Sequence, residues 1–342
     1  MDARRTTVAR LRWEVTDVNP SGAEPQGGGA PAEPESGQLP LFGPGPEREV
    51  GRGEFRGLEF VHVRARTIVN RVDPRSPVPF RYTINAYRGC SHACTYCFAR
   101  PTHEYLGLDP SSEFDRVIVV KVNAVERLRV ELAPSRWQGD PIAMGTNTDP
   151  YQRAEGKYRL TRGIVEVLAA ARNPFSILTK GTLVLRDLDV LTEASRRTKV
   201  TMSFSIGTLD EDVWRATEPG TPHPLKRVEA VARLNEAGVP CGVLVAPVLP
   251  GLSDRDDQLD DVVRACVEAG ATSISPVLLH LRRGVREHYL ATLAASRPDL
   301  LELHQERYGA NAYGPAEERE RLSRTVRELV RRHRARSGRR VP

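Results

Sequence analysis

The sequence predicts an α/β protein whose core is an incomplete barrel of six β/α repeats. From about residue 54 onward, strand-like segments alternate with segments that carry the i, i+3, i+4 apolar stripe of helices. Such alternation implies parallel strands joined by right-handed crossovers. No G-x-G-x-x-G motif follows any expected strand, so a dinucleotide-binding fold lacks its fingerprint. Six repeats suit a β/α barrel that does not close.

The expected elements follow in chain order. The expected strands are 82–87, 141–147, 175–179, 199–206, 239–245 and 272–277. The helices expected between them are 123–132, 161–172, 185–197, 225–237 and 256–269. The fourth and fifth strands are short and rich in apolar residues, and Gly238 and Gly270 directly follow the last two helices, as terminating glycines do. In a barrel of this kind the chemistry lies where strands end and loops begin.

The composition divides the chain into three expected parts. Residues 21–48 hold seven Gly and six Pro among 28 positions. The segment has too few apolar groups for their burial to offset the entropy lost when the chain becomes ordered. We therefore expect residues 1–48 to be mostly disordered, although residues 8–18 fit a weak strand or a docking peptide. Residues 49–280 should form the barrel, and residues 281–342 a helical extension with a basic tail.

The basic charge belongs to that tail. Residues 319–340 contain ten Arg and two Glu, a charge of +8; subtracting this from the chain's +6 leaves about −2 elsewhere. An amphipathic helix is expected over 316–331, because apolar residues recur there at helical spacing: Leu322, Val326, Leu329 and Val330. The arginines fit a solvated charged helix or a contact with nucleic-acid phosphates. No run approaches the ~18 apolar residues of a membrane span, so no membrane partner is expected.

Three cysteines form the most informative motif. Cys90, Cys94 and Cys97 have the spacing C-x-x-x-C-x-x-C and directly follow the first expected strand. Four thiolates would close a tetrahedral structural site, whereas three leave one metal position open for chemistry. The alternative is a zinc site completed by His92 or His103, although no second ligand pair follows.

The cysteine count favours metal ligands over disulfides. The chain has five cysteines, an odd number, and no apolar signal segment opens it. We therefore expect a reducing, cytoplasmic setting, where clustered cysteines act as metal ligands.

With Tyr96 before the last cysteine, the loop resembles the cluster loop of radical S-adenosylmethionine (SAM) enzymes. Further stretches resemble the spore photoproduct lyase-related, DNA repair photolyase-like branch, and in particular its uncharacterised actinobacterial-type members. The stretches are 85–105, 145–152, 158–162, 178–180, 203–206 and 218–221. Together the resemblance covers roughly residues 60–280.

This resemblance implies a radical mechanism. The three cysteines would hold three irons of a 4Fe–4S cluster, and the fourth iron would chelate the methionine end of S-adenosylmethionine. A one-electron donor such as a flavodoxin or ferredoxin would reduce the cluster. Cofactor cleavage would then give methionine and a 5′-deoxyadenosyl radical, which abstracts hydrogen from a substrate over the barrel mouth. The branch implies lyase-like chemistry on a DNA lesion or another nucleic acid.

Five residues are expected to bind the cofactor: Tyr96, Asn147, Asp149, Lys180 and Ser205. Asp149 could accept from the cofactor ammonium, or form an Asx turn with the following proline. Lys180 ends an apolar strand and could pair with the cofactor carboxylate, or be a solvated surface lysine. Ser205 and Tyr96 fit a cofactor contact or ordinary packing.

The chain departs from the lyase pattern in one respect. Lyase-type members use a cysteine just after the second strand as hydrogen donor, and residues 143–149 contain none. A side-chain donor would then be Tyr151, Tyr158, or Cys241 if it faces the barrel mouth. Two other function classes stay open: a radical enzyme acting on a protein or small metabolite, and a non-catalytic metal-dependent nucleic-acid-binding module.

Overall fold

A seven-stranded sheet forms the centre of the molecule. The computed structural model describes residues 46–76, 78–133 and 137–337. The sheet has the order β11-β10-β9-β8-β7-β4-β3, and only the edge strand β3 is antiparallel to its neighbour. Its strands are β3 (Val69–Arg71), β4 (Tyr82–Ile84), β7 (Ile142–Met144), β8 (Phe175–Thr179), β9 (Val200–Ser205), β10 (Cys241–Val248) and β11 (Ile274–Leu278).

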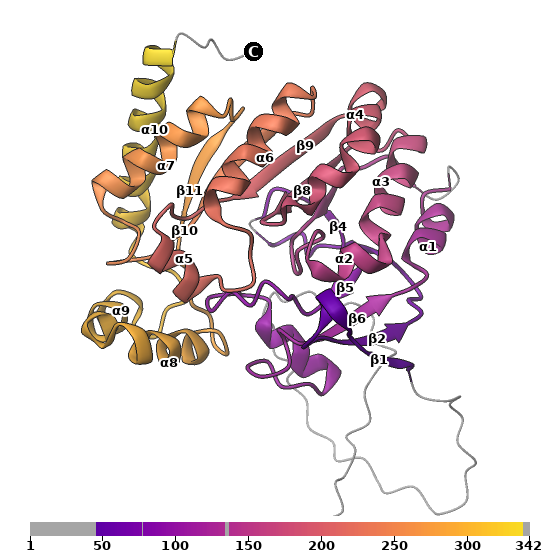
Figure 1. Ribbon diagram of the computed structural model, residues 1–342, viewed down its shortest axis with the longest axis horizontal. Helices are drawn as coiled ribbons and strands as arrows, with labels where there is room; N and C mark the ends of the chain where they lie inside the picture. Colours follow the sequence, from indigo (N-terminus) through magenta and orange to yellow (C-terminus); the bar gives the residue numbers. More distant parts are fainter. Residues whose placement is uncertain (1–45, 77, 134–136, 338–342) are drawn as a thin grey trace, which may run out of the picture.

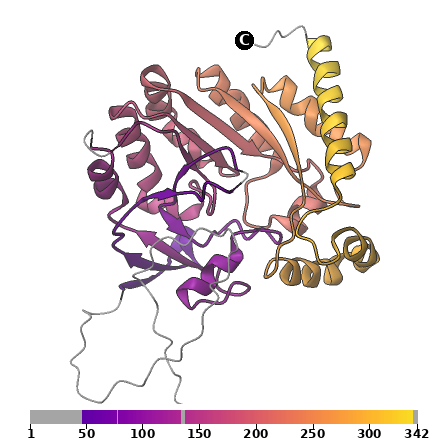
Figure 2. The same cartoon turned by 180° about the vertical axis from the view of Figure 1, so that it is seen from behind.

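Helices cover one face of this sheet (Figure 1). They are α1 (Ala124–Glu131), α3 (Leu160–Ala170), α4 (Leu188–Arg197), α6 (Pro224–Glu236), α7 (Asp256–Glu268) and α10 (Ala316–Ser337). Side chains alternate between the two faces of each strand. In β9, for example, Val200, Met202 and Phe204 are buried in the main core, whereas Thr201 and Ser203 are only half-buried. Figure 2 shows the molecule from behind, where the strands are in view.

The predicted fold class is confirmed: six parallel strands alternate with helices in an α/β arrangement of the expected order. One predicted strand is wrong in detail. The segment 82–87 is divided, because β4 ends at Ile84 and the chain then leaves the barrel sheet. Tyr87 and Arg88 form β5, which pairs with β6 (Val117–Lys121) in a second sheet.

This second sheet was not predicted. It has four strands in the order β1-β2-β6-β5, with β1 at Arg48–Val50 and β2 at Glu59–Val63. All five residues of β6 are buried, as in a strand covered on both faces. Because β5 leads directly into the cysteine loop, the second sheet holds the start of that loop.

The C-terminal helices pack against two different cores. The helix expected over 316–331 is confirmed as α10, which continues to Ser337, contacts α7 and β11, and buries its apolar stripe in the main core. Helices α8 (Arg286–Ser296) and α9 (Leu301–Tyr308) instead form a smaller core that includes Cys94 and Tyr96. The disorder expected for residues 1–48 lies almost wholly outside the described residues, as do residues 8–18 and the last five positions.

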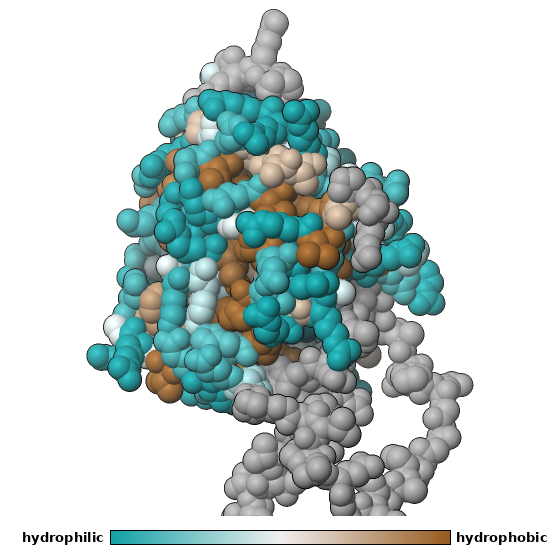
Figure 3. Space-filling model, turned by 90° about the vertical axis from the view of Figure 1, so that its right-hand side faces the viewer, coloured by the Kyte–Doolittle hydropathy of each residue, from teal (hydrophilic) through white to brown (hydrophobic). Residues whose placement is uncertain are grey.

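The surface carries both polar and apolar side chains. Figure 3 shows a face on which apolar residues form a band between polar margins. None of the helices within the described ranges has the length and apolar character that crossing a membrane would require.

Candidate active site

The loop that carries the three cysteines is held at its start by two side chains that follow β7. The Thr148 hydroxyl and the Gln152 amide donate to the Gly89 carbonyl at 2.7 and 2.9 Å. Gln152 also accepts from the Ser91 amide at 3.0 Å. Gly89 has a φ of +79°, and a Cβ there would lie 2.6 Å from the Val117 carbonyl oxygen, so only glycine fits.

A second clamp comes from the segment between α5 (Glu211–Thr217) and α6. The Thr95 amide donates to the Thr217 carbonyl, and the Gly220 amide donates to the His92 carbonyl, both at 3.0 Å. A Cβ on Gly220 would lie 2.1 Å from the Ser91 carbonyl oxygen. Glycine at this position therefore lets the two segments meet backbone to backbone.

Arg100 fixes the middle of the cysteine loop from η2 (Arg100–Leu106). Its side chain is buried, and Nε and Nη2 donate to the Cys94 carbonyl at 3.2 and 3.1 Å. Nη2 also lies 2.9 and 2.8 Å from the two carboxylate oxygens of Asp115. This arginine therefore has a counter-ion and acts on the loop geometry.

The three thiols fit a cluster held by three cysteines. Cys90 and Cys94 are buried, Cys97 is half-buried, and all are free. Burial raises the pKa of each thiol, that of Cys94 to about 12, and the neighbouring thiols raise the pKa of Cys90 and Cys94 further. Iron must displace the protons of these thiols to bind.

The zinc alternative has no geometric support in the described part of the chain. There, no three His, Cys, Asp or Glu side chains converge on a single ion position. A tetrahedral zinc site needs such convergence. In a 4Fe–4S cluster each thiolate binds a different iron, so the thiols need not converge on one ion.

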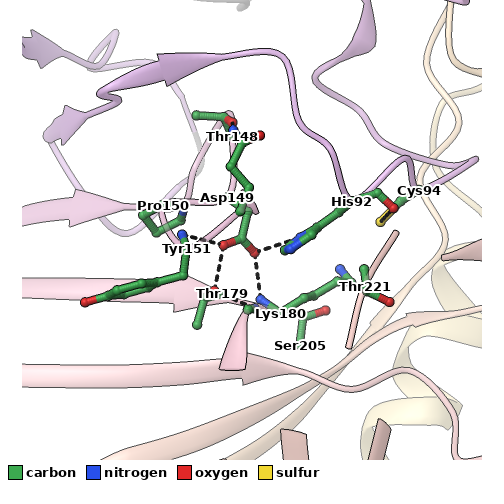
Figure 4. A network of polar contacts seen from close by, with 12 residues as sticks. His92, Cys94, Thr148, Asp149, Pro150, Tyr151, Thr179, Lys180, Ser205 and Thr221 are labelled. Carbon is green, nitrogen blue, oxygen red and sulfur yellow. Dashed lines mark hydrogen bonds and ion pairs between the residues drawn. The ribbon is translucent and has the colours of Figure 1, made fainter. Parts of the chain in front are cut away.

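Asp149 joins the end of β7 to the end of β8 (Figure 4). Its Oδ1 accepts from the Tyr151 amide at 2.8 Å and from the Thr179 hydroxyl at 2.7 Å. Its Oδ2 accepts from the Lys180 amide at 2.7 Å and lies 3.3 Å from His92 Nδ1. Burial raises the pKa of Asp149, but His92 and the hydrogen-bond donors outweigh it and lower this pKa to about 2. The Asx turn considered from the sequence is present, and contact with a cofactor ammonium stays a prediction.

Lys180 is a mostly buried cation near the cysteines. Its side chain is 15% exposed, and Nζ lies 3.8 Å from Glu218 Oε1 and 5.6 Å from the ring centroid of Tyr96. Burial lowers the pKa of Lys180, but Glu218 and the Cys94 thiol outweigh it, and the net pKa is raised. Lys180 is therefore not a solvated surface lysine, which was the alternative interpretation of this residue in the sequence.

Glu218 and Arg227 complete a buried polar network that the sequence did not reveal. The Tyr96 hydroxyl donates to Glu218 Oε1, and Arg227 Nη2 lies 2.5 Å from Glu218 Oε2. Burial raises the pKa of Glu218, but Arg227 and Lys180 outweigh it and lower the pKa. Glu218 lies in the stretch 218–221, one of those that carry the family resemblance. Its burial could not be predicted from the sequence, because it depends on the tertiary structure. Arg227 is only 1% exposed, although an arginine on an amphipathic helix normally lies on the solvated face.

Two predicted cofactor residues lie at strand ends. Ser205 is buried at the end of β9, and its hydroxyl donates to the Ala246 carbonyl at 2.6 Å. Asn147 is half-buried in the loop after β7. In that loop Gly145 has a φ of +82°, and a Cβ there would lie 1.9 Å from the Leu178 carbonyl oxygen. The loop therefore passes directly over β8, next to Lys180.

The residues predicted to donate a hydrogen atom to the substrate radical lie away from the cysteine loop. Tyr151 is buried in the main core, and Figure 4 shows its ring pointing away from His92 and Cys94. Tyr158 lies at the end of α2 (Arg153–Tyr158) and bonds His62 of β2 at 2.6 Å.

Cys241 also fails to face the barrel mouth. It is buried in the main core, and burial raises its pKa, with a further contribution from the neighbouring Cys266 of α7. The structure therefore brings none of the three candidate donors to the cysteine loop.

Comparison with known proteins identifies the family. A model described as the radical SAM superfamily matches residues 84–263, which is more than half of the chain. The chain belongs to the radical SAM superfamily. Its relative Rv2578c of Mycobacterium tuberculosis is 41% identical over 324 residues, or 95% of this chain and 93% of the relative. MJ0683 of Methanocaldococcus jannaschii is 28% identical over 197 residues, 58% of this chain and 70% of the relative.

Solved radical SAM structures share the fold. Spore photoproduct lyase complexed with dinucleoside spore photoproduct superposes with a TM-score of 0.61 at 20% identity, covering 80% of this chain and 79% of the lyase. A mutant lyase with bound AdoMet and the same dinucleoside superposes with a TM-score of 0.60 at 18% sequence identity and the same coverage of both chains. As a radical SAM enzyme, the protein uses S-adenosylmethionine and iron–sulfur chemistry and needs an electron donor.

Proposed function

We propose that the protein holds a 4Fe–4S cluster on Cys90, Cys94 and Cys97 and binds S-adenosylmethionine beside it through Lys180. One observation carries this proposal. Among the residues that the structure describes, the Lys180 ammonium has no hydrogen-bond acceptor, because Glu218 at 3.8 Å is too distant for one. A mostly buried ammonium normally has such a partner. A ligand carboxylate would supply it.

The other residues have positioning roles in this proposal. Asp149 contacts both the Lys180 backbone amide and the His92 ring, and so fixes the positions of these two residues relative to each other. Glu218 holds the Tyr96 hydroxyl, which keeps the ring beside Lys180, where it can pack against the adenine. Ser205 and Asn147 line the adjoining strand ends. When bound, the reduced cluster and cofactor supply a 5′-deoxyadenosyl radical for hydrogen abstraction; the protein supplies orientation and excludes water.

The substrate is proposed to be a nucleic acid, and the reaction lyase-like. Spore photoproduct lyase, which shares this fold, is complexed with dinucleoside spore photoproduct in two solved structures, and this supports a nucleic acid as the substrate class. Because the three candidate donors lie in other places, we propose that the substrate radical does not end at Tyr151, Tyr158 or Cys241. Hydrogen return from the cofactor, or electron loss to another acceptor, then ends the reaction.

Reconstitution tests the proposed function. Anaerobically reconstituted protein should contain about four irons per chain. With dithionite it should release 5′-deoxyadenosine and methionine in equal amounts. Cys94→Ala should abolish this cleavage, because one iron loses its ligand, whereas Cys266→Ala, on α7 in the main core, should retain it. Full cleavage by Cys94→Ala, or a colourless zinc-loaded protein, would contradict the proposal.

A further inference from the structure

A half-buried arginine without a counter-ion lies beside the cysteine loop. Arg282 follows the carboxyl end of β11, and its Nη2 donates to the Phe98 carbonyl at 2.5 Å. Its Nε is buried and has no hydrogen-bond partner among the described residues. Within the described ranges it forms no ion pair, and the nearby polar groups are Tyr105, Cys97, Glu104 and Tyr313.

An arginine in this environment can bind an anion. Burial lowers the pKa of Arg282, because removing a guanidinium from water costs free energy that the neighbouring Glu104 carboxylate and other nearby groups offset only in part. Its planar fork of donors matches the geometry of phosphate and carboxylate. A bound anionic group would satisfy Nε and restore the missing charge compensation.

Three exposed aromatic residues lie near this arginine. Phe98, Tyr105 and Tyr313 are 43%, 48% and 55% exposed. Rings of this size are normally covered in a monomer, so three of them gathered around one arginine mark an interaction surface. His280 stacks on Tyr313 with ring centroids 4.3 Å apart, which holds that ring in place. We call Phe98, Tyr105, Arg282 and Tyr313 the aromatic rim.

The aromatic rim borders the active site. Phe98 directly follows the cluster residue Cys97. The segment after β11 packs against η2, since a Cβ on Gly284 would lie 2.9 Å from Cγ of Pro101. Both cartoon views show α8, which continues this segment, near the cysteine loop (Figures 1 and 2). A chain bound on the rim would thus lie next to the cysteine loop.

We propose that the aromatic rim binds single-stranded nucleic acid, with a phosphodiester at Arg282 and bases stacked on the exposed rings. The proposal rests on the proposed function, because it names the substrate class of the same site. A charged groove with aromatic side chains is how proteins hold single strands. In a duplex the bases are already stacked and cannot reach the rings. An acidic peptide could meet Arg282, but it has no planar groups matching three separate rings.

We do not assign this nucleic-acid contact to the arginine-rich end of α10. Figure 1 shows that α10 carries the chain away from the cysteine loop toward the opposite end of the molecule. There His333 lies 2.7 Å from Asp260, which Arg332 also contacts. Arg334 donates to the carbonyls of residues 271 and 272, after α7. These side chains hold the helix to the core.

Binding of labelled oligonucleotides tests the proposal. The anaerobically reconstituted full chain is titrated into fluorescein-labelled 12-nucleotide single-stranded DNA and RNA, and anisotropy is followed from 50 to 200 mM salt. Arg282→Gln should weaken binding about tenfold and reduce the log–log salt slope by about 0.7, the value for one phosphate contact on a single strand. Tyr105→Ala should weaken binding about tenfold through lost stacking. The matched control Arg233→Gln, on the exposed side of α6, should change neither quantity.

Three outcomes would overturn the proposal. The first is that wild type binds neither oligonucleotide, and the second is that the Tyr105 and Arg282 variants bind like wild type. The third is that an acidic peptide, and no oligonucleotide, binds with dependence on Arg282. Because Arg282 also holds the Phe98 carbonyl, Tyr105→Ala tests the rim without touching the loop. Iron content and dithionite-driven cofactor cleavage of wild type report the proposed function separately: if both are present and binding is not, only this inference fails.

Discussion

At the scale of single residues, Lys180 is the group on which the proposed cofactor binding depends most. Its ammonium shares Glu218 with Arg227, which lies far closer to that carboxylate, at 2.5 Å against 3.8 Å. Glu218 is therefore compensated mainly by Arg227, and the Lys180 ammonium has no hydrogen bond to any residue in the described part of the chain. A lysine in this state is prepared to bind an incoming carboxylate.

Replacing Lys180 should therefore weaken cofactor binding. We expect Lys180→Ala to lower the affinity for S-adenosylmethionine about ten- to hundredfold, the effect of losing one charge-assisted contact. Calorimetry on reconstituted protein measures this, with iron content as the check that the cluster remains. The exposed Lys226 of α6 offers a matched control for the lost charge. Unchanged affinity in both Lys180→Ala and Ser205→Ala would return these residues to ordinary structural roles.

At the scale of elements, the cysteine loop depends on segments far away in the sequence. The segment 148–152 after β7 holds its start, the end of α5 and the segment after it hold its middle, and Arg100 of η2 joins the Cys94 carbonyl to Asp115. No single element fixes the three thiols. A change in any of these supports should loosen the loop without removing a ligand.

Gly220 is the sharpest test of this support. Gly220→Ala places a Cβ 2.1 Å from the Ser91 carbonyl oxygen, so one backbone must move. We expect a loss of about 1–3 kcal/mol in the free energy of unfolding, as for overpacked sites, together with lower iron content after reconstitution. Urea denaturation and iron analysis measure the two effects. Gly156→Ala in α2 is the control, since its Cβ would meet Phe55 at an ordinary 3.7 Å. Equal stability of the two variants would count against the clamp.

At the scale of the whole molecule, a buried histidine couples stability to pH. His103 is fully buried in η2 and bonds the Val117 carbonyl at 3.1 Å. Burial lowers its pKa to about 4, against 6.5 in the unfolded chain, and the carbonyl opposes this only in part. Between these values the unfolded chain binds the proton and the folded one does not, so stability falls as pH falls.

The expected size can be measured. From pH 7 to pH 5 the His103 contribution should fall by about 2 kcal/mol. Urea unfolding at both pH values gives the total change for wild type. His103→Gln cannot take up the proton, so its stability should change by about 2 kcal/mol less over the same interval. If the two proteins lose equal stability, His103 does not make this contribution.

What the sequence determined by itself was local. Cys90, Cys94 and Cys97 lie within eight positions, so their spacing alone predicts metal ligands, and with Tyr96 the loop resembles the cluster loop of the family. The strand and helix periods and the glycines after helices likewise depend on neighbouring residues, which is why the barrel and α10 were predictable. The cysteine motif placed after the first strand also located the site.

Only the tertiary structure decided which distant side chains meet. Tyr96 and Glu218 are 122 positions apart in the chain, and their contact depends on where the segment after α5 packs. The direction of Tyr151, the four partners of Asp149 and the place of the arginine-rich helix end depend on packing in the same way. Burial and long-range contacts arise from the whole chain at once, so no window of sequence contains them.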